Sequence, residues 1–250
     1  MRQRRKYRNP PIQEALCEFQ FVAAGDWDPT IPGRLYERLR EAYSGKPRQQ
    51  LQAGIQISGG PSPTSLKWEA GIPRVQFVTP GADRLVSVGQ NSISIHVLPP
   101  YGGWEEFRPR IAAALEAYQE IVKPDGVKRI GVRYINRITI NDDHLTLSDF
   151  FAVPPQMPDE LDVNISNFFL RLETAYVDLP IQLIQTFGSA PSEPGSAAFI
   201  LDLDVIREWE DDSLPVEEAL SQVDTLRDRE RDAFEALITD QARGMFDADR

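Results

Sequence analysis

The segment KRIGVRYINRITIN, residues 128–141, decides the fold because its side chains alternate in character from one residue to the next. Successive side chains of a β-strand point to opposite faces of a sheet, so the alternation predicts a strand with two unlike faces. The mainly apolar face holds Ile130, Val132, Tyr134, Asn136, Ile138 and Ile140. The opposite face holds Arg129, Gly131, Arg133, Ile135, Arg137 and Thr139. A chain with a formal charge of −11 therefore lines three arginines along one strand.

Shorter strands and one short helix are predicted on the N-terminal side of this segment. Residues 9–23, NPPIQEALCEFQFVA, alternate as a half-buried strand does. A surface helix follows, with Thr30 placed as its N-cap and Gly45 just past its end. Gly, Pro and Asn turn residues then separate five strands of an expected antiparallel meander. These strands cover residues 53–58, 65–70, 74–79, 84–90 and 92–98.

Two further helices are predicted from apolar residues spaced three or four apart. The first covers residues 104–122, with a stripe of Trp104, Phe107, Ile111, Leu115, Tyr118 and Val122. The second runs from about Pro215 to Phe246, with a stripe of Val216, Leu220, Val223, Leu226, Phe234 and Leu237. A charged break interrupts the second stripe between Leu226 and Phe234. Between the two helices, strands are expected at residues 168–177, 180–188 and 197–206.

This order of elements predicts an α+β fold, with antiparallel sheets packed against two long helices in two similar halves. In each half a strongly alternating strand leads into a long helix, which favours an internal duplication. The expected parts are a basic flexible tail (1–10), a first α+β half (11–141), a connecting loop (142–165) and a second α+β half with a long acidic C-terminal helix (166–250).

Composition restricts the partners of the chain. The stretch from Asp202 to Arg250 holds sixteen acids and six arginines, whereas residues 1–50 hold ten bases and six acids. This balance disfavours nucleic acid, because duplex binding requires clustered cations. No apolar run is long enough for a membrane span, and the basic N-terminus lacks the apolar segment of a signal peptide. The single cysteine, Cys17, lies in an alternating apolar stretch and is expected to be a buried thiol, so we predict a cytoplasmic protein.

Recognisable catalytic chemistry is scarce. The only histidines are His96, in an expected strand, and His144, beside Asp142 and Asp143 in what reads as a turn. A triad of Ser92, His96 and an acid lacks the G-x-S-x-G turn that would support it, and no phosphate-binding glycine loop is present. The sequence therefore predicts no catalytic residue, no metal site and no cofactor, and does not favour an enzyme.

The arginine strand is the strongest polar feature, and two interpretations stay open. Each arginine could pair with an acid of a neighbouring strand or helix, and at least one of the three is expected to do so. Alternatively, the strand lines a groove for an anion or an acidic helix, where the planar guanidinium offers two parallel hydrogen bonds. The candidate binding residues are Arg129, Arg133, Tyr134, Asn136 and Arg137.

Three segments, in order, carry a resemblance that spans nearly the whole chain. They are NPPIQEALCEFQF near the start, RIGVRYINRITI in the middle and AFEALITDQARGMF at the end. Together they resemble a sporadically distributed family of bacterial proteins of similar length and undefined function. The resemblance implies a bacterial, cytoplasmic protein with the patchy occurrence of genes in mobile elements or defence loci. It supplies no catalytic residues.

From these observations we expect a non-enzymatic protein-binding or regulatory subunit of a bacterial operon, of an antitoxin-like or defence-associated kind. Its expected partner is another protein encoded nearby, and a homo-oligomer is a further option. The alternative is a domain that binds a small ligand or an anion, with or without catalysis, in a cleft lined by the strand from Arg129 to Arg137.

Overall fold

The computed structural model describes residues 5–22, 27–50, 53–56, 67–70, 74–141, 145–161, 163–210 and 212–247. Nine of its strands form one sheet with the order β2-β5-β6-β7-β1-β8-β11-β10-β9, and every neighbouring pair is antiparallel. These strands are β1 (Ile12–Phe21), β2 (Arg48–Gln50), β5 (Arg74–Val78), β6 (Arg84–Gly89), β7 (Ser92–Val97), β8 (Val127–Ile140), β9 (Phe169–Ala175), β10 (Gln182–Ala190) and β11 (Ala197–Glu208). A separate pair joins β3 (Ala53–Gln56) to β4 (Lys67–Ala70).

The predicted architecture of antiparallel sheets in two similar halves, packed against two long helices, is wrong. A single nine-stranded sheet passes through both expected halves, because β8 of the first pairs with β11 of the second along almost its whole length. On its other side β8 pairs with β1. Alternation along one strand shows which side chains share a face, but it does not show which distant strand will be its neighbour. The sequence therefore predicted the individual strands but not how they pair into one sheet.

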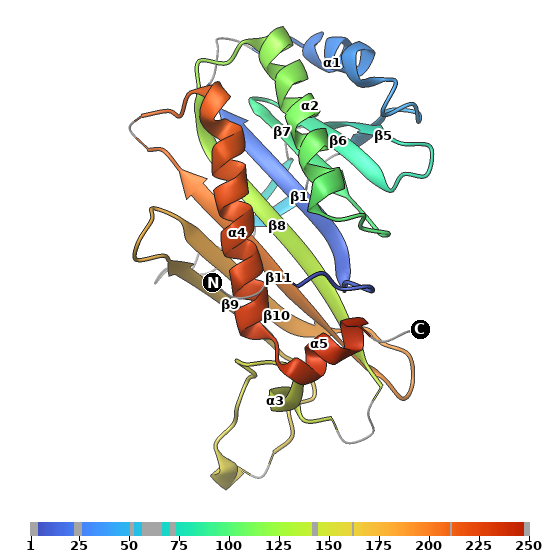
Figure 1. Cartoon of the computed structure of the whole chain (residues 1–250), viewed down its shortest axis with the longest axis vertical. Helices are drawn as coiled ribbons and strands as arrows, with labels where there is room; N and C mark the ends of the chain where they lie inside the picture. Colours follow the sequence, from blue (N-terminus) through green and yellow to red (C-terminus); the bar gives the residue numbers. More distant parts are fainter. Residues whose placement is uncertain are drawn as a thin grey trace.

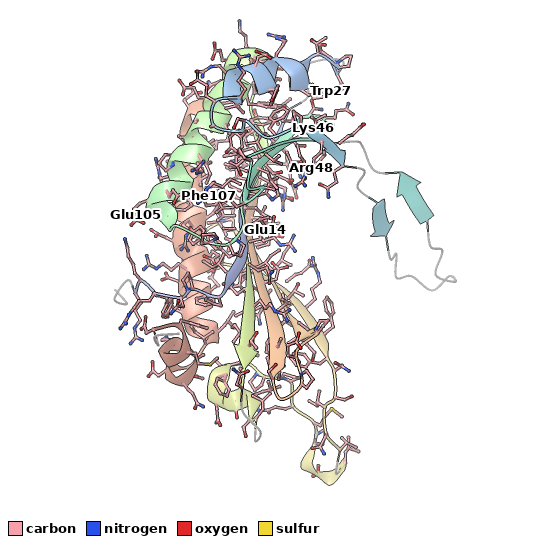
Figure 2. All side chains as sticks on the ribbon, turned by 90° about the vertical axis from the view of Figure 1, so that its right-hand side faces the viewer. Glu14, Trp27, Lys46, Arg48, Glu105 and Phe107 are labelled. Atoms are coloured by element: carbon pink, nitrogen blue, oxygen red, sulfur yellow. The ribbon has the colours of Figure 1, made fainter. Side chains whose placement is uncertain are left out.

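Helices cover one face of this sheet. The described residues form α1 (Ile31–Leu39), α2 (Trp104–Val122), α3 (Leu147–Phe150), α4 (Ala219–Leu237) and α5 (Asp240–Asp247), with short 3₁₀ turns at Asp159–Leu161 and Val216–Glu218. Figure 1 shows α2 and α4 lying side by side across the sheet, with α4 passing over β8 and β11. In the view at 90°, Phe107 of α2 points toward the sheet and Glu105 lies on the outer side (Figure 2). Among the described residues, no helix combines the length and apolar character that a membrane crossing needs.

The C-terminal helix ends earlier than its apolar pattern predicted. Instead of one helix from about 215 to 246, α4 stops at Leu237 and α5 begins at Asp240. Ile238 is extended between them, is 3% exposed, and pairs with Phe151 in an isolated β-bridge. This tertiary contact, rather than a glycine or proline, bends the chain.

The described part of the N-terminal segment contacts the rest of the chain, within a stretch, residues 1–10, that was predicted to be a flexible tail. The backbone N–H of Asn9 donates to the carbonyl oxygen of Phe246 at 2.9 Å, and that of Arg137 donates to the carbonyl of Pro11 at 2.8 Å. The ring of Tyr7 meets that of Phe246 edge-on, with centroids 5.4 Å apart. Aromatic and backbone contacts thus join this segment to α5 and to β8.

Candidate ligand-binding site

The predicted site residues lie on two opposite faces of β8. Tyr134 and Asn136 face α4 and are 1% and 2% exposed, while the arginines occupy the face turned away from the helices. Period-two geometry requires this separation, so a single cleft lined by Tyr134, Asn136, Arg133 and Arg137 does not form. The two faces are therefore described separately.

On the face without helices, Arg129 is surrounded by carboxylates. Its guanidinium lies 3.2 Å from Glu18 Oε1, 3.5 Å from Asp204 Oδ2 and 3.2 Å from Glu208 Oε1. A second cation, Arg74, also reaches Glu18 at 3.0 Å. Burial raises the pKa of Asp204 despite the nearby arginines. Arg129 therefore neutralises acids of β1 and β11 and stabilises the packing of these strands on either side of β8.

Arg133 and Arg137 also have partners within the chain. Arg133 forms a two-pronged ion pair with Asp202, with Nε to Oδ1 at 2.8 Å and the second nitrogen to Oδ2 at 2.5 Å. Hydrogen bonding to Asp202 raises the pKa of Arg133. Arg137 donates to the carbonyl oxygen of Pro191. The expectation that at least one of the three arginines pairs with an acid is confirmed, for Arg129 and Arg133.

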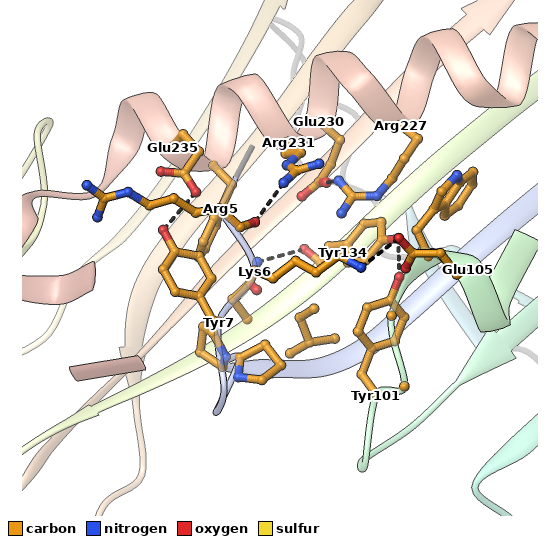
Figure 3. Close-up of a pocket in the computed structure, with 18 of the residues that line it drawn as sticks. Arg5, Lys6, Tyr7, Tyr101, Glu105, Tyr134, Arg227, Glu230, Arg231 and Glu235 are labelled. Carbon is orange, nitrogen blue, oxygen red and sulfur yellow. Dashed lines mark hydrogen bonds and ion pairs between the residues drawn. The ribbon is translucent and has the colours of Figure 1, made fainter. Parts of the chain in front are cut away.

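On the helix-covered face, a pocket of about 260 Å³ opens between α4, β8, the start of α2 and the N-terminal segment. Figure 3 shows the side chains that converge on it from these four elements. Residues 227, 230, 231, 234 and 235 of α4 line one side because a spacing of three or four puts them on one helical face. Its volume lies just below the usual range of about 300–1,000 Å³ for small-molecule sites.

Two tyrosines and an asparagine form the inner wall. The hydroxyl groups of Tyr101 and Tyr134 lie 2.8 Å apart, and their rings meet edge-on with centroids separated by 5.7 Å. Burial raises the pKa of both hydroxyl groups, so both keep their protons at neutral pH. Asn136 donates from Nδ2 to the carbonyl oxygen of Leu201 at 3.1 Å, which ties β8 to β11 beneath the pocket. The wall combines aromatic rings with polar atoms at selected points.

Arg227 is the main cation of the pocket. Only 16% of its side chain is exposed, and its guanidinium carbon lies 4.5 Å from the ring centroid of Tyr134 and 5.8 Å from that of Trp104. One of its terminal nitrogens donates to Glu230 Oε2 at 2.5 Å. Its Nε is buried and has no hydrogen-bond partner among the described residues. A buried guanidinium donor without an acceptor is costly, and the Nε atoms of Arg110 and Arg207 are in the same state elsewhere in the fold.

Glu230 is the only acid that the structure pairs with Arg227 within the described chain, and it is 3% exposed. Burial raises the pKa of its carboxyl group to about 7, against the opposing effects of Arg227 and Arg231. At neutral pH the carboxyl group is therefore protonated in a large share of molecules. In that state Arg227 carries a positive charge that Glu230 does not balance.

Weaker contacts close the outer side of the pocket. Lys6 Nζ lies 2.8 Å from Glu105 Oε1, and both side chains are more than two thirds exposed. The hydroxyl group of Tyr7 donates to Glu235 Oε1 at 2.7 Å, and Arg231 donates to the backbone carbonyl of Arg5 at 2.6 Å. Figure 3 shows Lys6 reaching across toward Glu105. An exposed ion pair of this kind is weak, so the Lys6 side chain can leave Glu105 at little cost.

The lining is positive in a chain that is negative as a whole. Five cationic side chains and three carboxylates contribute to the pocket: Arg5, Lys6, Arg8, Arg227 and Arg231, with Glu105, Glu230 and Glu235. The formal charge of the whole chain is −11. Concave sites lined by one sign of charge concentrate ligands of the other sign. The geometry and charge of this pocket suit an anion.

No protein-family model matches the chain, and no curated protein matches it. The resemblance of three segments to a bacterial family stays a prediction. The proposed function therefore rests on the chemistry of the pocket.

Two of the predicted site residues line this pocket, whereas its charged side was not predicted. Tyr134 and Asn136 were expected in a binding site, whereas Arg227 and Glu230 were read as part of a charged break in an apolar stripe. The missed signal is the register of that stripe, because Leu226, Glu230 and Phe234 follow each other at a spacing of four. A carboxylate at an apolar stripe position predicts either a break in packing or a buried ionisable group.

A second polar cluster lies on the opposite face of the sheet and has the hydrogen bonds of a nucleophile, a base and an acid. His96 Nε2 lies 2.8 Å from Ser94 Oγ, and His96 Nδ1 lies 2.6 Å from Glu14 Oε1. Ser94, however, is 1% exposed and sits in mid-strand opposite Glu18 of β1 and Ser87 of β6. Backbone N–H groups there bond to neighbouring strands and do not form an oxyanion hole. The cluster links β7 to β1.

The described residues contain no group of three or more His, Cys, Asp or Glu side chains placed to hold a metal ion. The loop residues Asp142, Asp143 and His144, considered as a metal cluster in the sequence, lie outside the described residues.

Proposed function

We propose that this chain is a binding protein for a small anion, a carboxylate or a phosphate ester, and that the pocket beneath α4 is its site. The observation that carries the proposal is Arg227, a largely buried guanidinium that lines the pocket and has Glu230 as its one acid partner among the described residues. Arginine offers a planar fork that matches carboxylate and phosphate oxygens.

The state of Glu230 supports an anionic ligand rather than a cationic one. An ionised Glu230 would compete with an anion for Arg227, whereas a protonated Glu230 leaves the guanidinium free and can donate a hydrogen bond. Because its pKa is about 7, the carboxyl group can take up a proton at little cost when an anion arrives. Binding is then coupled to proton uptake and weakens as the pH rises above 7.

The lining also restricts the uncharged part of the ligand. Tyr101, Trp104 and Phe234 give the pocket aromatic surface, and Pro10 and Pro11 close it at the N-terminal segment. A volume of about 260 Å³ suits a ligand of one ring or a short chain. We therefore propose a compact metabolite with one anionic group and an apolar body.

Four probe compounds test this function. Benzoate and phenyl phosphate present the two anionic groups on the same ring, while benzamide and benzamidine are a neutral and a cationic analogue. We expect either anion to raise the melting temperature of the protein, because a ligand that binds only the folded state stabilises it. Benzamide and benzamidine should have no effect.

Arg227→Met and Arg133→Met are the matched variants for this test, since each removes one guanidinium, from opposite faces of the sheet. Anion binding should be lost with Arg227→Met and kept with Arg133→Met. Equal binding by both variants, or stabilisation by benzamide as large as that by benzoate, contradicts the proposed function.

A second function, the protein-binding regulatory subunit predicted from the sequence, has one observation in its favour. Large apolar side chains are exposed between residues 153 and 177: Val153, Met157, Leu161, Val163, Ile165, Phe169, Leu172 and Val177. Clustered exposed apolar residues often mark a protein interface. Co-purification with the product of a neighbouring gene would support this role, and the absence of any stable complex with such products would count against it.

A further inference from the structure

The strand β9 forms one edge of the nine-stranded sheet. Its sequence FLRLETA contains neither proline nor lysine, and its register with β10 is continuous from Phe169 to Ala175. Edge strands are usually shortened, bulged or protected by lysine or proline, because an open edge can pair with another chain. The other edge, β2, has only three residues, Arg48–Gln50. β9 is thus the longer and less protected of the two edges.

The open edge of β9 is surrounded by exposed apolar side chains. Phe169 is 75% exposed and Leu172 is 38% exposed, and Val177 follows just beyond the strand at 106%. Burial of such side chains against a partner is favourable by roughly 25 cal/mol per Å² of apolar surface. Their position on an edge strand favours a partner that adds a strand.

Backbone hydrogen bonds show which groups face this open edge. The N–H of Ser189 donates to the carbonyl of Phe168 at 3.0 Å, and the N–H of Tyr176 donates to the carbonyl of Ile181 at 2.9 Å. In an antiparallel pair, residues bonded to the neighbouring strand alternate with residues whose backbone groups point away. Even-numbered residues of β9 therefore bond to β10. The outward groups belong to Phe169, Arg171, Glu173 and Ala175.

These outward residues form a pattern that is complementary to itself. When two copies of β9 run antiparallel with Leu172 opposite Leu172, Arg171 of each lies opposite Glu173 of the other, and Phe169 opposite Ala175. The Arg171–Glu173 and Phe169–Ala175 pairs join outward-facing residues, so each of these pairs can exchange two backbone hydrogen bonds. Opposite charges directly across a strand pair stabilise it.

The neighbouring registers are unfavourable. A register centred on Arg171 puts two arginines opposite each other, and one centred on Glu173 does the same with two glutamates. Like charges in this position are destabilising. A shift by a single residue would bring outward groups against groups already bonded to β10. The charges of β9 thus specify one register.

We propose that β9 is a homodimer interface, in which a second copy of this chain pairs with it antiparallel about Leu172 and extends the sheet across both subunits. In the single chain, Arg171 and Glu173 pair with each other at 2.7 Å, with side chains 48% and 60% exposed. In the dimer the same four side chains form an alternating network across the two strands. This inference is independent of the anion pocket, which lies under α4.

Charge exchange tests the register. Arg171→Glu alone and Glu173→Arg alone each oppose like charges across the pair, so analytical ultracentrifugation should show the dimer dissociation constant of either rising at least tenfold. The double variant Arg171→Glu/Glu173→Arg restores opposite charges and should recover the dimer. An equimolar mixture of the two single variants should form a heterodimer, because one chain then carries two acids and the other two bases at these positions.

Disulfide trapping gives a second, geometric test. Leu172 faces its own copy in a pair that is not hydrogen-bonded, where Cα atoms lie about 4.5 Å apart and a disulfide fits. Leu172→Cys should therefore form a covalent dimer on mild oxidation. Leu170→Cys is the control, because its copy lies four residues further along the strand, about 13 Å away. The native Cys17 is buried and does not interfere.

The inference is overturned by a wild-type monomer at all accessible concentrations, by a dimer that Arg171→Glu leaves intact, or by equal cross-linking of the two cysteine variants. A wild-type monomer that pairs through β9 only with a different protein would also overturn it, and would assign the edge to a foreign partner. Unchanged circular dichroism melts of the variants would show that lost assembly is not lost folding.

Discussion

Arginines on the two sides of β8 lie in contrasting surroundings: Arg129 and Arg133 of β8 itself on the open face, and Arg227 of α4 on the helix face. On the open face, Arg129 has three carboxylates within 3.5 Å, and Arg133 has both oxygens of Asp202. On the helix face, the guanidinium of Arg227 is partly bound by Glu230, whose own pKa is raised to about 7. The difference teaches that a row of arginines in a sequence is a weaker sign of a site than one arginine that lines a pocket beside a carboxyl group of raised pKa.

The physical cause of this contrast is the balance between burial and pairing. Glu208 and Asp204 of β11 lie opposite Arg129 and Arg133 in the sheet register, so the charges of these two arginines are matched as the strands pair. Arg137 lies opposite Ile200 and donates to the carbonyl oxygen of Pro191 instead. Beneath α4 the matching is incomplete, because removal of a carboxylate from water costs more than the neighbouring arginine returns. Groups left in that condition cluster at functional sites.

The largest effect is expected from Arg129→Met. This change leaves Glu18 and Asp204, whose side chains are 18% and 19% exposed, without their shared cation. Removal of one partner from a buried ion pair costs about 3–5 kcal/mol. Urea denaturation should show this loss in the free energy of unfolding while benzoate binding stays unchanged. A loss below 1 kcal/mol would mean that the arginine row is not part of the structural framework.

Glu230→Gln should change the pH dependence of stability. The folded pKa of about 7 lies above the ordinary value of 4.5, so the stability that protonated Glu230 contributes is present below 4.5 and is lost as the pH rises through 7. The variant stays neutral throughout. Relative to wild type, its free energy of unfolding should therefore increase by about 3 kcal/mol between pH 4.5 and 8. Parallel stability curves for the two proteins would show that Glu230 does not titrate in this range.

The sequence could predict the local parts of this site. Alternation along residues 128–141 correctly separated Tyr134 and Asn136 from the arginines, and the expected stripe on α2 is buried at Phe107 and Ile111. Cys17 is buried, as expected. The error was to combine residues of opposite faces into one cleft.

The remaining features depend on contacts between distant segments. Neither the pairing of β8 with β11 nor the packing of Tyr7 against Phe246 leaves a periodic signal in the sequence. The buried state of Glu230 follows from the covering of α4 by the N-terminal segment and the sheet. Local sequence patterns describe single elements. This pocket forms where α4, β8, the start of α2 and the N-terminal segment meet, so no single pattern predicts it.

Tyr101→Phe, a change on the helix-covered face, should lower the stability of the protein moderately. The variant removes one hydroxyl group and leaves that of Tyr134, which is 1% exposed, without its partner at 2.8 Å. A lost hydrogen bond of this kind costs about 1 kcal/mol. Thermal denaturation measures the change, and Tyr36→Phe, a half-buried tyrosine of α1 whose ring packs against Phe77, serves as the control for loss of a tyrosine hydroxyl. An equal effect of the two substitutions would contradict the importance of the tyrosine pair.

The smallest effect on stability is expected from Lys6→Ala. Lys6 and Glu105 form an exposed ion pair across the outer side of the pocket, so its removal should leave the melting temperature unchanged. Dissociation of bound benzoate, followed by stopped-flow fluorescence, should become faster because the pocket is more open. Slower or unchanged dissociation would mean that the ligand leaves the pocket by another route.

Calorimetric titration of benzoate at pH 6 and pH 8 tests the central claim most directly. Benzoate keeps its charge over this range, so a change in affinity reports on the protein. We predict that wild type and Arg133→Met bind about tenfold more tightly at pH 6 than at pH 8, since a carboxyl group with a pKa of about 7 changes its protonated fraction by that factor. Arg227→Met should not bind at either pH. Binding by Arg227→Met with wild-type affinity would contradict the account.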